Sequence, residues 1–404
     1  MPWRETSAMD ERLRFVQDVY RPGWPFSEVC ARYTVSRKTG YKWLARYGEG
    51  GPEALSDRSH RPRGCPHATP AEVVRLILQL QRRYTWGARK VRTLLAARVP
   101  PAQLPTKTTV HRILERHGRV KPRRRSRRRF HQGPPGTPMD APNAVWTADF
   151  KGQFRMRSSV YCYPLTVQDG ATRFLLGCRG LLQPTTEGSW PVFAGLFRRY
   201  GLPERIRTDN GSPFASNALG RLSTLSVWWV RLGIRPELIE PAHPEQNGRH
   251  ERMHKTLKAA TARPPQANLT AQQRAFDAFR HRYNTVRPHE ALNDATPASC
   301  YTPSPRPYRT TLDTLDYPGH FERRLVSRNG GIRWSNRWVN VSHLLAELEI
   351  GFEEIDDGLW NVYFGPVWLG RFHEAVGCIV DQLNRPARRR GGNHKGTRKV
   401  SPIS

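Results

Sequence analysis

Apolar and polar positions follow a helical spacing in two stretches near the N-terminus. In residues 1–60, MDERLRFVQDVY is amphipathic, and PFSEVCARYTVSRKTGYKWLARY predicts two helices around a tight turn at TVS. Ser36 is the expected N-cap of the second of these helices. Residues 68–120 predict three more helices, the second after Gly87 and the third capped by a threonine, which together would form a second helix-turn-helix-like domain. The Gly-, Pro- and Ser-rich stretch 50–70 is predicted to be a linker.

The pattern changes to strands in residues 143–300. AVWTADFKGQF, SVYCYPLTVQDG and TRFLLGCRGL are predicted strands, because β-branched and aromatic residues dominate them. Helical runs and short strands then alternate, which predicts an α/β domain with a mixed sheet. Residues 305–385 are again rich in strands, with turn signals at RNGG and DDG, and predict a small β domain.

Composition adds a nucleic-acid partner to this multidomain picture. Lys plus Arg number 66 against 34 for Asp plus Glu, a net charge of +32, which favours a polyanion as partner, although a compositional bias could give the same excess. The linker 121–142 contains a basic run expected to clamp phosphates, and the tail 386–404 is basic and predicted to be disordered. Within this run, the arginines expected to contact DNA are Arg123, Arg124, Arg125, Arg127 and Arg128.

The six cysteines are scattered without a CxxC pair, so neither a disulfide framework nor a zinc ribbon is expected. No apolar stretch reaches about 18 residues and no signal peptide opens the chain, so we expect a cytoplasmic protein with no membrane partner.

The first helix pair has the features of a helix-turn-helix reader of double-stranded DNA. Its second helix is expected to expose basic and hydroxyl residues toward the major groove. Any two packed helices with a solvated basic face would look similar. The expected DNA-contacting residues are Arg37, Lys38, Thr39 and Lys42.

Two aspartates occupy positions suited to a metal site. In VWTADF, strand alternation puts Asp149 on one face with Val145 and Thr147. A buried, unpaired aspartate is costly unless it binds a cation, but an edge strand would leave it facing solvent. Asp209 ends a short strand before Asn-Gly, where a plain turn role is the alternative.

Two glutamates compete to complete the site. Glu245 lies in turn sequence, whereas Glu251 is expected in the first turn of a helix that starts after Gly248. Lys255 and Lys258 follow Glu251 on the same helix face, so an ordinary surface ion pair is the alternative. Three carboxylates from two strands and a helix could hold two Mg²⁺ ions about 4 Å apart.

The chain resembles IS481-type insertion-sequence transposases of the DDE, retroviral-integrase-like superfamily. The matching stretches cover about residues 140–310 and include WTADFKGQF, RTDNGSPFAS, HPEQNGRHERMHKTLK and YNTVRPHEAL. The resemblance implies an RNase H-like core, two Mg²⁺ or Mn²⁺ ions, cleavage at insertion-element ends and strand transfer into target DNA. It maps the acidic residues onto Asp149, Asp209 and Glu251. It also implies a homo-oligomer on the terminal inverted repeats, in the bacterial nucleoid.

The spacing of the acidic residues complicates this mapping. Between Asp209 and Glu245 lie 35 residues, the spacing often given for the superfamily, and between Asp209 and Glu251 lie 41. We prefer Glu251, because the family's motif block ends at the glutamate of GRHER, and the six extra residues fall in the helical GRLSTLSVWWVRLG region. Lys255 and Lys258 are expected to contact the DNA backbone.

Other interpretations remain open from the sequence. A DNA-binding regulator with an inactive core, or a structure-specific nuclease that cleaves without joining, would share most of these features. Asp169 in VQDG is interpreted as a turn residue, and a structural role for His289 is at least as well supported as a catalytic one.

Overall fold

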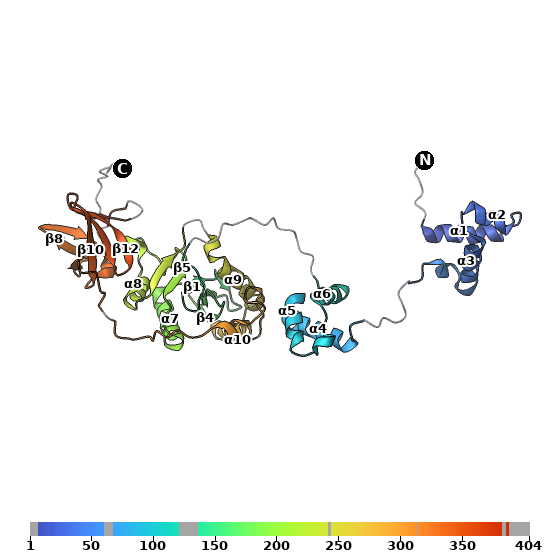
Figure 1. Cartoon of the computed structure of the whole chain (residues 1–404), viewed down its shortest axis with the longest axis horizontal. Coiled ribbons are helices and arrows are strands. Elements are labelled where there is room, and N and C mark those ends of the chain that lie inside the picture. Colours follow the sequence, from blue (N-terminus) through green and yellow to red (C-terminus); the bar gives the residue numbers. More distant parts are fainter. Residues whose placement is uncertain are drawn as a thin grey trace. The chain divides into compact units, whose positions relative to one another are not determined.

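The structure is a computed structural model, in which the chain divides into two compact units, Met1–Pro70 and Ala71–Ser404 (Figure 1). The described residues are 7–59, 68–120, 136–240, 244–312, 314–381 and 385–387, without the side chains of residues 244 and 245. The basic run 121–130, with the five arginines expected to contact DNA, lies outside them, as does nearly all of the tail 386–404. The domain boundaries given above therefore stay a prediction.

The first unit contains three helices, α1 (Ala8–Tyr20), α2 (Phe26–Arg32) and α3 (Arg37–Gly50). Ser36 caps α3 as predicted, because its hydroxyl accepts a hydrogen bond from the backbone N–H of Thr39. Phe15 of α1, Val29 of α2 and Trp43 of α3 form the buried core of this unit.

The predicted linker 50–70 is wrong at its start. Pro52–Leu55 forms a 3₁₀ helix, η1, in which the Leu55 side chain is fully buried. The Arg12 guanidinium of α1 donates a hydrogen bond to the Leu55 carbonyl at 2.8 Å. Gly and Pro here mark a turn inside the folded unit, because an apolar residue after the turn reaches the core.

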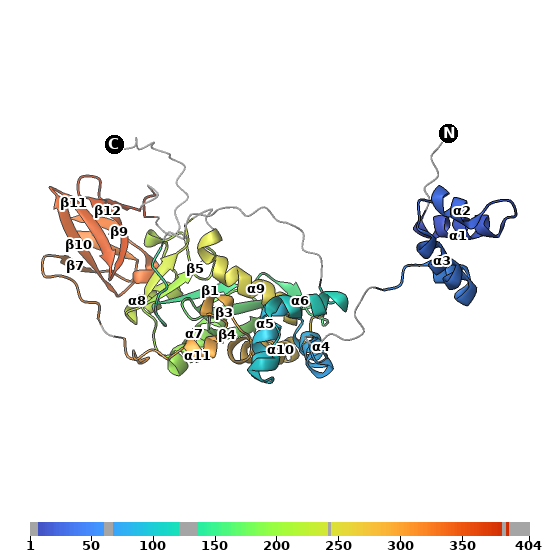
Figure 2. The ribbon, with the colours of Figure 1, turned by 45° about the vertical axis from the view of Figure 1, so that its right-hand side comes forward.

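The second helical stretch contains α4 (Ala71–Tyr84), α5 (Ala88–Ala96), η2 (Pro101–Gln103) and α6 (Lys107–Arg116). Gly87 is the N-cap of α5, and the Thr106 hydroxyl caps α6, as predicted. These helices, blue to cyan in Figure 2, contact the domain that follows. Arg89 of α5 pairs with Asp294 at 2.9 Å.

The central domain has a mixed sheet in the order β2-β3-β1-β5-β6, with β4 also paired to β3. β1 and β3 are antiparallel, as are β3 and β4, whereas β1–β5 and β5–β6 are parallel. β1 is therefore a central strand, which removes the edge-strand alternative for Asp149. The strands are β1 (Val145–Phe150), β2 (Phe154–Arg155), β3 (Tyr161–Asp169), β4 (Leu175–Leu181), β5 (Arg205–Thr208) and β6 (Arg235–Leu238).

Helices cover both faces of this sheet. Trp146, Ala148 and Ile206 form an apolar face that packs on α7 and α8. The alternate residues of the same strands, among them Thr147 and Thr166, face α9 and α10. The helices are α7 (Thr186–Tyr200), η3 (Leu219–Arg221), α8 (Thr224–Arg231), η4 (Pro244–Asn247), α9 (Gly248–Thr261), α10 (Leu269–Thr285), η5 (Glu290–Leu292) and α11 (Pro297–Cys300).

The C-terminal domain is a five-stranded antiparallel sheet in the order β13-β12-β11-β10-β7, with a separate hairpin β8–β9. The predicted turns hold, since Gly330 of RNGG and Gly358 of DDG have φ of 75° and 65°. The elements are β7 (Glu322–Leu325), β8 (Gly331–Trp334), β9 (Arg337–Asn340), η6 (His343–Leu345), β10 (Glu349–Asp356), β11 (Leu359–Phe364), β12 (Val367–His373) and β13 (Cys378–Val380).

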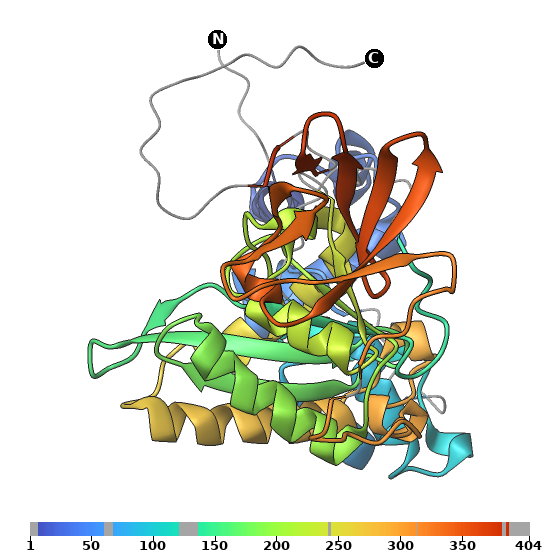
Figure 3. The ribbon, with the colours of Figure 1, turned by 90° about the vertical axis from the view of Figure 1, so that its left-hand side faces the viewer.

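The C-terminal domain shares one hydrophobic core with the central domain. Leu219, Val227 and Val230 from η3 and α8 pack in the same buried cluster as Val362 and Phe364 of β11. Figure 3 shows the C-terminal strands, orange to dark red, beside the yellow-green segment that includes α8. Removing either domain would expose this cluster to water.

Within the described ranges, no helix is both long and apolar enough to cross a membrane. Five cysteines there are free: Cys30, Cys162, Cys178, Cys300 and Cys378.

Candidate active site

The two aspartates lie side by side at one edge of the sheet. β1 and β5 are parallel, and Ala148 is the register partner of Thr208. Asp149 and Asp209 are the residues directly after Ala148 and Thr208. Both therefore lie at the carboxyl ends of neighbouring strands. Side chains on paired strands that share a face are close neighbours. The structure thus brings together two residues that are 60 positions apart in the numbering.

A tight turn holds Asp209 in place. The Gly211 N–H donates a hydrogen bond to Asp209 Oδ1 at 3.2 Å, as expected for aspartate before Asn-Gly. The Asn210 amide donates to the Ile239 carbonyl and accepts from Arg221, which ties the turn to its surroundings. The turn role and the position beside Asp149 are therefore compatible.

Glu251 lies in the first turn of α9, as predicted. Met253 and Leu257 anchor this helix in a buried cluster, while Glu251 itself is exposed. Glu251 lies close enough to Asp149 to raise the pKa of that carboxyl, as the least of several causes. Glu245 belongs to η4, and its side chain is outside the described part of the chain.

The aspartate pair resists ionisation in the absence of a cation. Burial, and next the nearby Asp209 carboxylate, raise the pKa of Asp149 to about 7, against the opposing effect of Lys151. Burial also raises the pKa of Asp209, partly offset by the Gly211 N–H. Two half-buried carboxylates with raised pKa values are typical of a functional site, and a divalent ion would relieve both effects.

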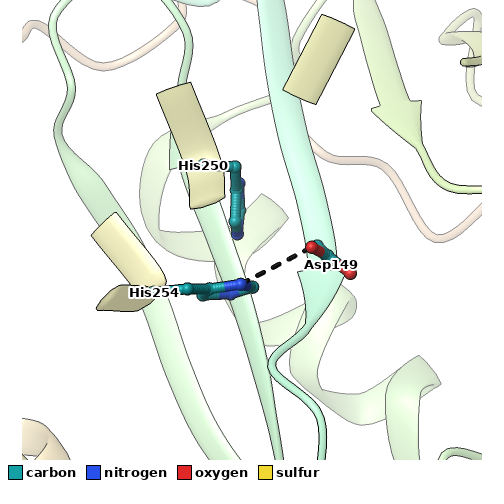
Figure 4. A group of neighbouring side chains, drawn as sticks. All are labelled: Asp149, His250 and His254. Carbon is teal, nitrogen blue, oxygen red and sulfur yellow. Dashed lines mark ion pairs between the residues drawn. The ribbon is translucent and has the colours of Figure 1, made fainter. Parts of the chain in front are cut away.

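Two histidines of α9 surround Asp149 (Figure 4). His254 Nδ1 lies 3.5 Å from Asp149 Oδ2, and its Nε2 lies 2.6 Å from the Thr166 hydroxyl. His250 lies between two hydroxyls, with Nδ1 at 2.8 Å from Thr147 and Nε2 at 2.6 Å from Thr166. Potential ligand atoms of Asp149, His250 and His254 lie within 4.8 Å of one another, close enough for one metal ion to bind among them.

Both imidazoles are neutral near pH 7. Burial lowers the pKa of His250 to about 3 and, with help from His250 and Lys151, that of His254 to about 2. Neither histidine is expected at the site from the sequence motifs. Their spacing of four positions, on the same helix face as Leu257, was the available signal.

Asn247 adds a buried amide to the site. Its side chain is 7% exposed, and Nδ2 lies 3.4 Å from Asp149 Oδ2. Its Oδ1 has no hydrogen-bond partner among the described protein atoms. An orphaned buried oxygen beside carboxylates indicates a place for a cation or a water molecule.

Asp169 and His289 have structural surroundings. Asp169 is fully buried and accepts hydrogen bonds from the backbone N–H groups of Asn143 and Thr172. It therefore fixes the turn after β3, in keeping with its interpretation from the sequence. The His289 ring lies 4.8 Å from that of Tyr283 at the end of α10.

The predicted DNA-contacting residues of α3 are mostly exposed. Arg37, Lys38 and Lys42 face solvent. Thr39 is half-buried, and its hydroxyl lies 2.9 Å from that of Ser36 at the helix cap. Its side chain thus interacts with the N-cap of α3. Its position on the helix alone did not predict this contact.

Lys255 and Lys258 are exposed on α9. Lys255 lines a groove between the end of α4 and helices α9 and α10. The groove also carries the cations Arg83, Arg252, Arg282 and Arg287, together with Trp86. The mixture of cations and an aromatic ring suits a nucleic-acid backbone and its bases.

Three family descriptions match the chain. Residues 232–297 match the Integrase core domain, residues 11–63 a Helix-turn-helix domain and residues 39–114 a Homeodomain-like domain. The integrase match contains α9 with Glu251 and both histidines. The other two matches together span both helical stretches.

Insertion-element proteins are among the curated relatives. The "Insertion element IS476 uncharacterized 39.2 kDa protein" of Xanthomonas euvesicatoria is 28% identical over 59% of this chain and 66% of that protein. The corresponding 31.7 kDa IS407 protein of Burkholderia multivorans is 28% identical over 57% and 81%. The "Putative transposase InsD for insertion element IS2E" of Escherichia coli is 33% identical over 25% and 46%. The matches thus span just under two thirds of the IS476 protein and under half of the InsD protein.

The HTLV-2 integrase catalytic core domain, solved in complex with magnesium, has 15% identity and a TM-score of 0.32 over 40% of this chain and 97% of that one. So low a score adds nothing to the argument from topology and from the family matches. The expected fold class is confirmed, with N-terminal helical units, an integrase-like α/β core and a C-terminal β domain. The chain joins helix-turn-helix domains to an integrase core domain, and its relatives include proteins named as insertion-element transposases.

Proposed function

We propose that this protein is a DNA transposase that cleaves the ends of an insertion element and joins them to target DNA. The observation that carries this proposal is the placement of Asp149 and Asp209 at adjoining strand ends, with Glu251 in electrostatic reach. Two neighbouring, half-buried carboxylates with raised pKa values favour metal-dependent chemistry over DNA binding alone.

The residues at this edge fit a divalent metal. Hard oxygen ligands suit Mg²⁺ and Mn²⁺, and the orphaned Asn247 Oδ1 and the raised pKa values of the aspartates indicate a cation site. Asp149, Asp209 and Glu251 would hold two ions. When bound, such ions activate a water or a 3′-hydroxyl and stabilise charge during in-line displacement at phosphorus.

The protein's own groups would position the reactants. The Asn-Gly turn orients Asp209, and the packing of Met253 and Leu257 orients Glu251. Arg252 and Lys255, next to Glu251 on α9, would hold the phosphates that flank the reacting one. The element's terminal inverted repeats would bind α3 through Arg37, Lys38 and Lys42.

The further expectations follow from the same proposal. A homo-oligomer would assemble on DNA, since two element ends must be held together. The bacterial nucleoid as the place of action also stays a prediction. Phosphate binding by Arg123, Arg124, Arg125, Arg127 and Arg128 of the basic run is proposed on charge alone.

The test is an end-joining assay with labelled duplexes that carry the terminal repeats. We expect cleavage and joining in Mg²⁺ or Mn²⁺, none in EDTA, and none with Asp209→Asn. Cleavage without joining would favour a nuclease. Specific binding of the repeats with neither reaction would favour a regulator, the second candidate, which the exposed basic face of α3 supports.

A further inference from the structure

The Thr166 hydroxyl is shared by both histidines. It has three neighbours, the Asp149 carbonyl oxygen at 3.0 Å and the Nε2 atoms of His250 and His254, both at 2.6 Å. A hydroxyl has one proton to donate and two lone pairs. If Thr166 donates to the carbonyl oxygen, which can only accept, both Nε2 atoms donate to Thr166. In this arrangement the Nδ1 atoms are left to bind other partners through their lone pairs.

The two Nδ1 lone pairs have different partners. That of His250 lies 2.8 Å from the Thr147 hydroxyl, whose one proton goes to Nδ1 in this arrangement and not to the Gln168 carbonyl oxygen at 3.2 Å. That of His254 points at Asp149 Oδ2, 3.5 Å away (Figure 4). A lone pair and a carboxylate oxygen are both acceptors, so this contact is favourable only with a positive species between them.

We propose that His254 Nδ1 is a ligand of the divalent ion held by Asp149, so that this ion has a mixed nitrogen and oxygen ligand set. This inference rests on the proposed function for the role of Asp149. Two ligands at about 2.0–2.2 Å from one ion can be 3.5 Å apart, as these two atoms are.

The surroundings of His254 match those of a metal ligand. A ligating histidine usually donates its other ring N–H to a second group, which fixes the ring, and Thr166 has that place here. The His254 side chain is 5% exposed, and its ring cannot turn away without breaking this contact. Asn247 Oδ1, buried and without a partner among the described atoms, offers a further oxygen beside Asp149.

The ligand set predicts a metal preference. Imidazole nitrogen suits Mn²⁺, Co²⁺ and Zn²⁺ better than Mg²⁺, which prefers oxygen throughout. We therefore expect the wild type to bind Mn²⁺ more tightly than Mg²⁺. This preference should be smaller in a variant in which an oxygen replaces Nδ1.

Pulsed electron paramagnetic resonance on the full-length protein with Mn²⁺, without DNA, tests the ligand directly. The expected result is a ¹⁴N coupling from a coordinated imidazole in the wild type. His254→Asn puts an oxygen near the place of Nδ1, so Mn²⁺ should stay bound while the coupling is lost. His281→Asn, at an exposed position of α10, is the control and should keep the coupling.

A second readout is the ratio of Mn²⁺ to Mg²⁺ affinity, measured by calorimetry. In His254→Asn the ratio should fall at least about tenfold. Loss of a group that only hydrogen-bonds to a metal ligand already lowers metal affinity by about this factor. His254→Gln, which can keep the contact with Thr166 but lacks an atom at the Nδ1 position, should weaken Mn²⁺ binding.

Bound Mn²⁺ without nitrogen coupling in the wild type would overturn the inference, and the contact would then be a proton shared between His254 and Asp149. A coupling that survives in His254→Asn would overturn it too. The wild-type spectrum decides even if the His254 variants fail to fold. If the protein joins DNA ends but shows no ¹⁴N coupling, the proposed function stands and this inference fails. If it shows the coupling but joins no ends, this inference stands and the proposed function fails.

Discussion

The two faces of the central sheet are made by alternate residues of the same strands, yet they differ in chemistry. Trp146 and Ala148 face α7 and α8, and their neighbours are apolar. Thr147 and Asp149 face α9, and their neighbours are polar. Both faces are buried, since Trp146 is 0% and Thr147 is 2% exposed. Burial alone therefore does not show which face of the sheet serves stability and which serves function. The side chains of the helix that covers each face distinguish the two.

The largest expected effect is on the polar face. Asp209→Asn should lower the rate of end joining at least about a thousandfold, because a catalytic ion contributes several kcal/mol to transition-state stabilisation. The melting temperature and the affinity for the terminal repeats should not fall. Joining at more than a tenth of the wild-type rate would remove the polar face from the chemistry.

The two glutamates allow a sharper comparison of similar size. Glu251→Gln should match Asp209→Asn in end joining, because Glu251 lies in electrostatic reach of Asp149. Glu245→Gln should retain activity within a fewfold of the wild type. The opposite result would assign the third carboxylate to Glu245, at the spacing of 35 residues from Asp209.

The apolar face is broken by Trp146→Ala. A large side chain is lost from a fully buried position, which should lower the free energy of unfolding by about 3–5 kcal/mol. Urea denaturation measures this loss, with the exposed Lys258→Ala as control. A loss below about 1 kcal/mol would mean that the surrounding helices close the cavity.

Asp149→Asn should stabilise the metal-free protein, in contrast to Trp146→Ala. A gain of about 1 kcal/mol in the free energy of unfolding would raise the melting temperature by a few degrees. The pKa of Asp149 is raised from 3.8 in the unfolded chain to about 7, so ionisation between these values destabilises the folded state. The difference between variant and wild type should grow from about pH 4 to about pH 7 and then level off.

Divalent metal provides the control for this prediction. Mg²⁺ or Mn²⁺ should raise the melting temperature of the wild type more at pH 8 than at pH 5, and that of Asp149→Asn little at either pH. If the difference between the two proteins did not change with pH, Asp149 would have an ordinary pKa.

The smallest effect is expected from the groove beside the polar face. Lys255→Ala should weaken DNA binding severalfold and reduce the slope of log affinity against log salt by about one, as for a single phosphate contact. Fluorescence anisotropy at several salt concentrations measures both quantities. An unchanged slope would place the DNA backbone away from Lys255.

Local patterns could be predicted from the sequence, and contacts between distant segments could not. Strand alternation predicted the side chains that share a face with Asp149, and residue type predicted the caps at Ser36 and Thr106. The roles of His250 and His254 depend on the docking of α9 on β3, which brings Thr166 to within 2.6 Å of both. No local rule contains that distance.

The error at Leu55 has the same origin. Glycine and proline signalled a break in regular structure correctly, but whether the next apolar residue is buried depends on the core of α1 and α3. The choice between Glu245 and Glu251 was better supported from the sequence, because helix start signals near Gly248 are local.

The cluster that joins Val227 and Val230 to β11 has a consequence for synthesis on the ribosome. The central domain emerges first and leaves the apolar side of α8 bare until residues 359–364 have been made. A chain that stops early would present that bare surface to proteases and chaperones. Incomplete copies with all three acidic residues in place would then be removed, and only fully translated protein would persist in the cell.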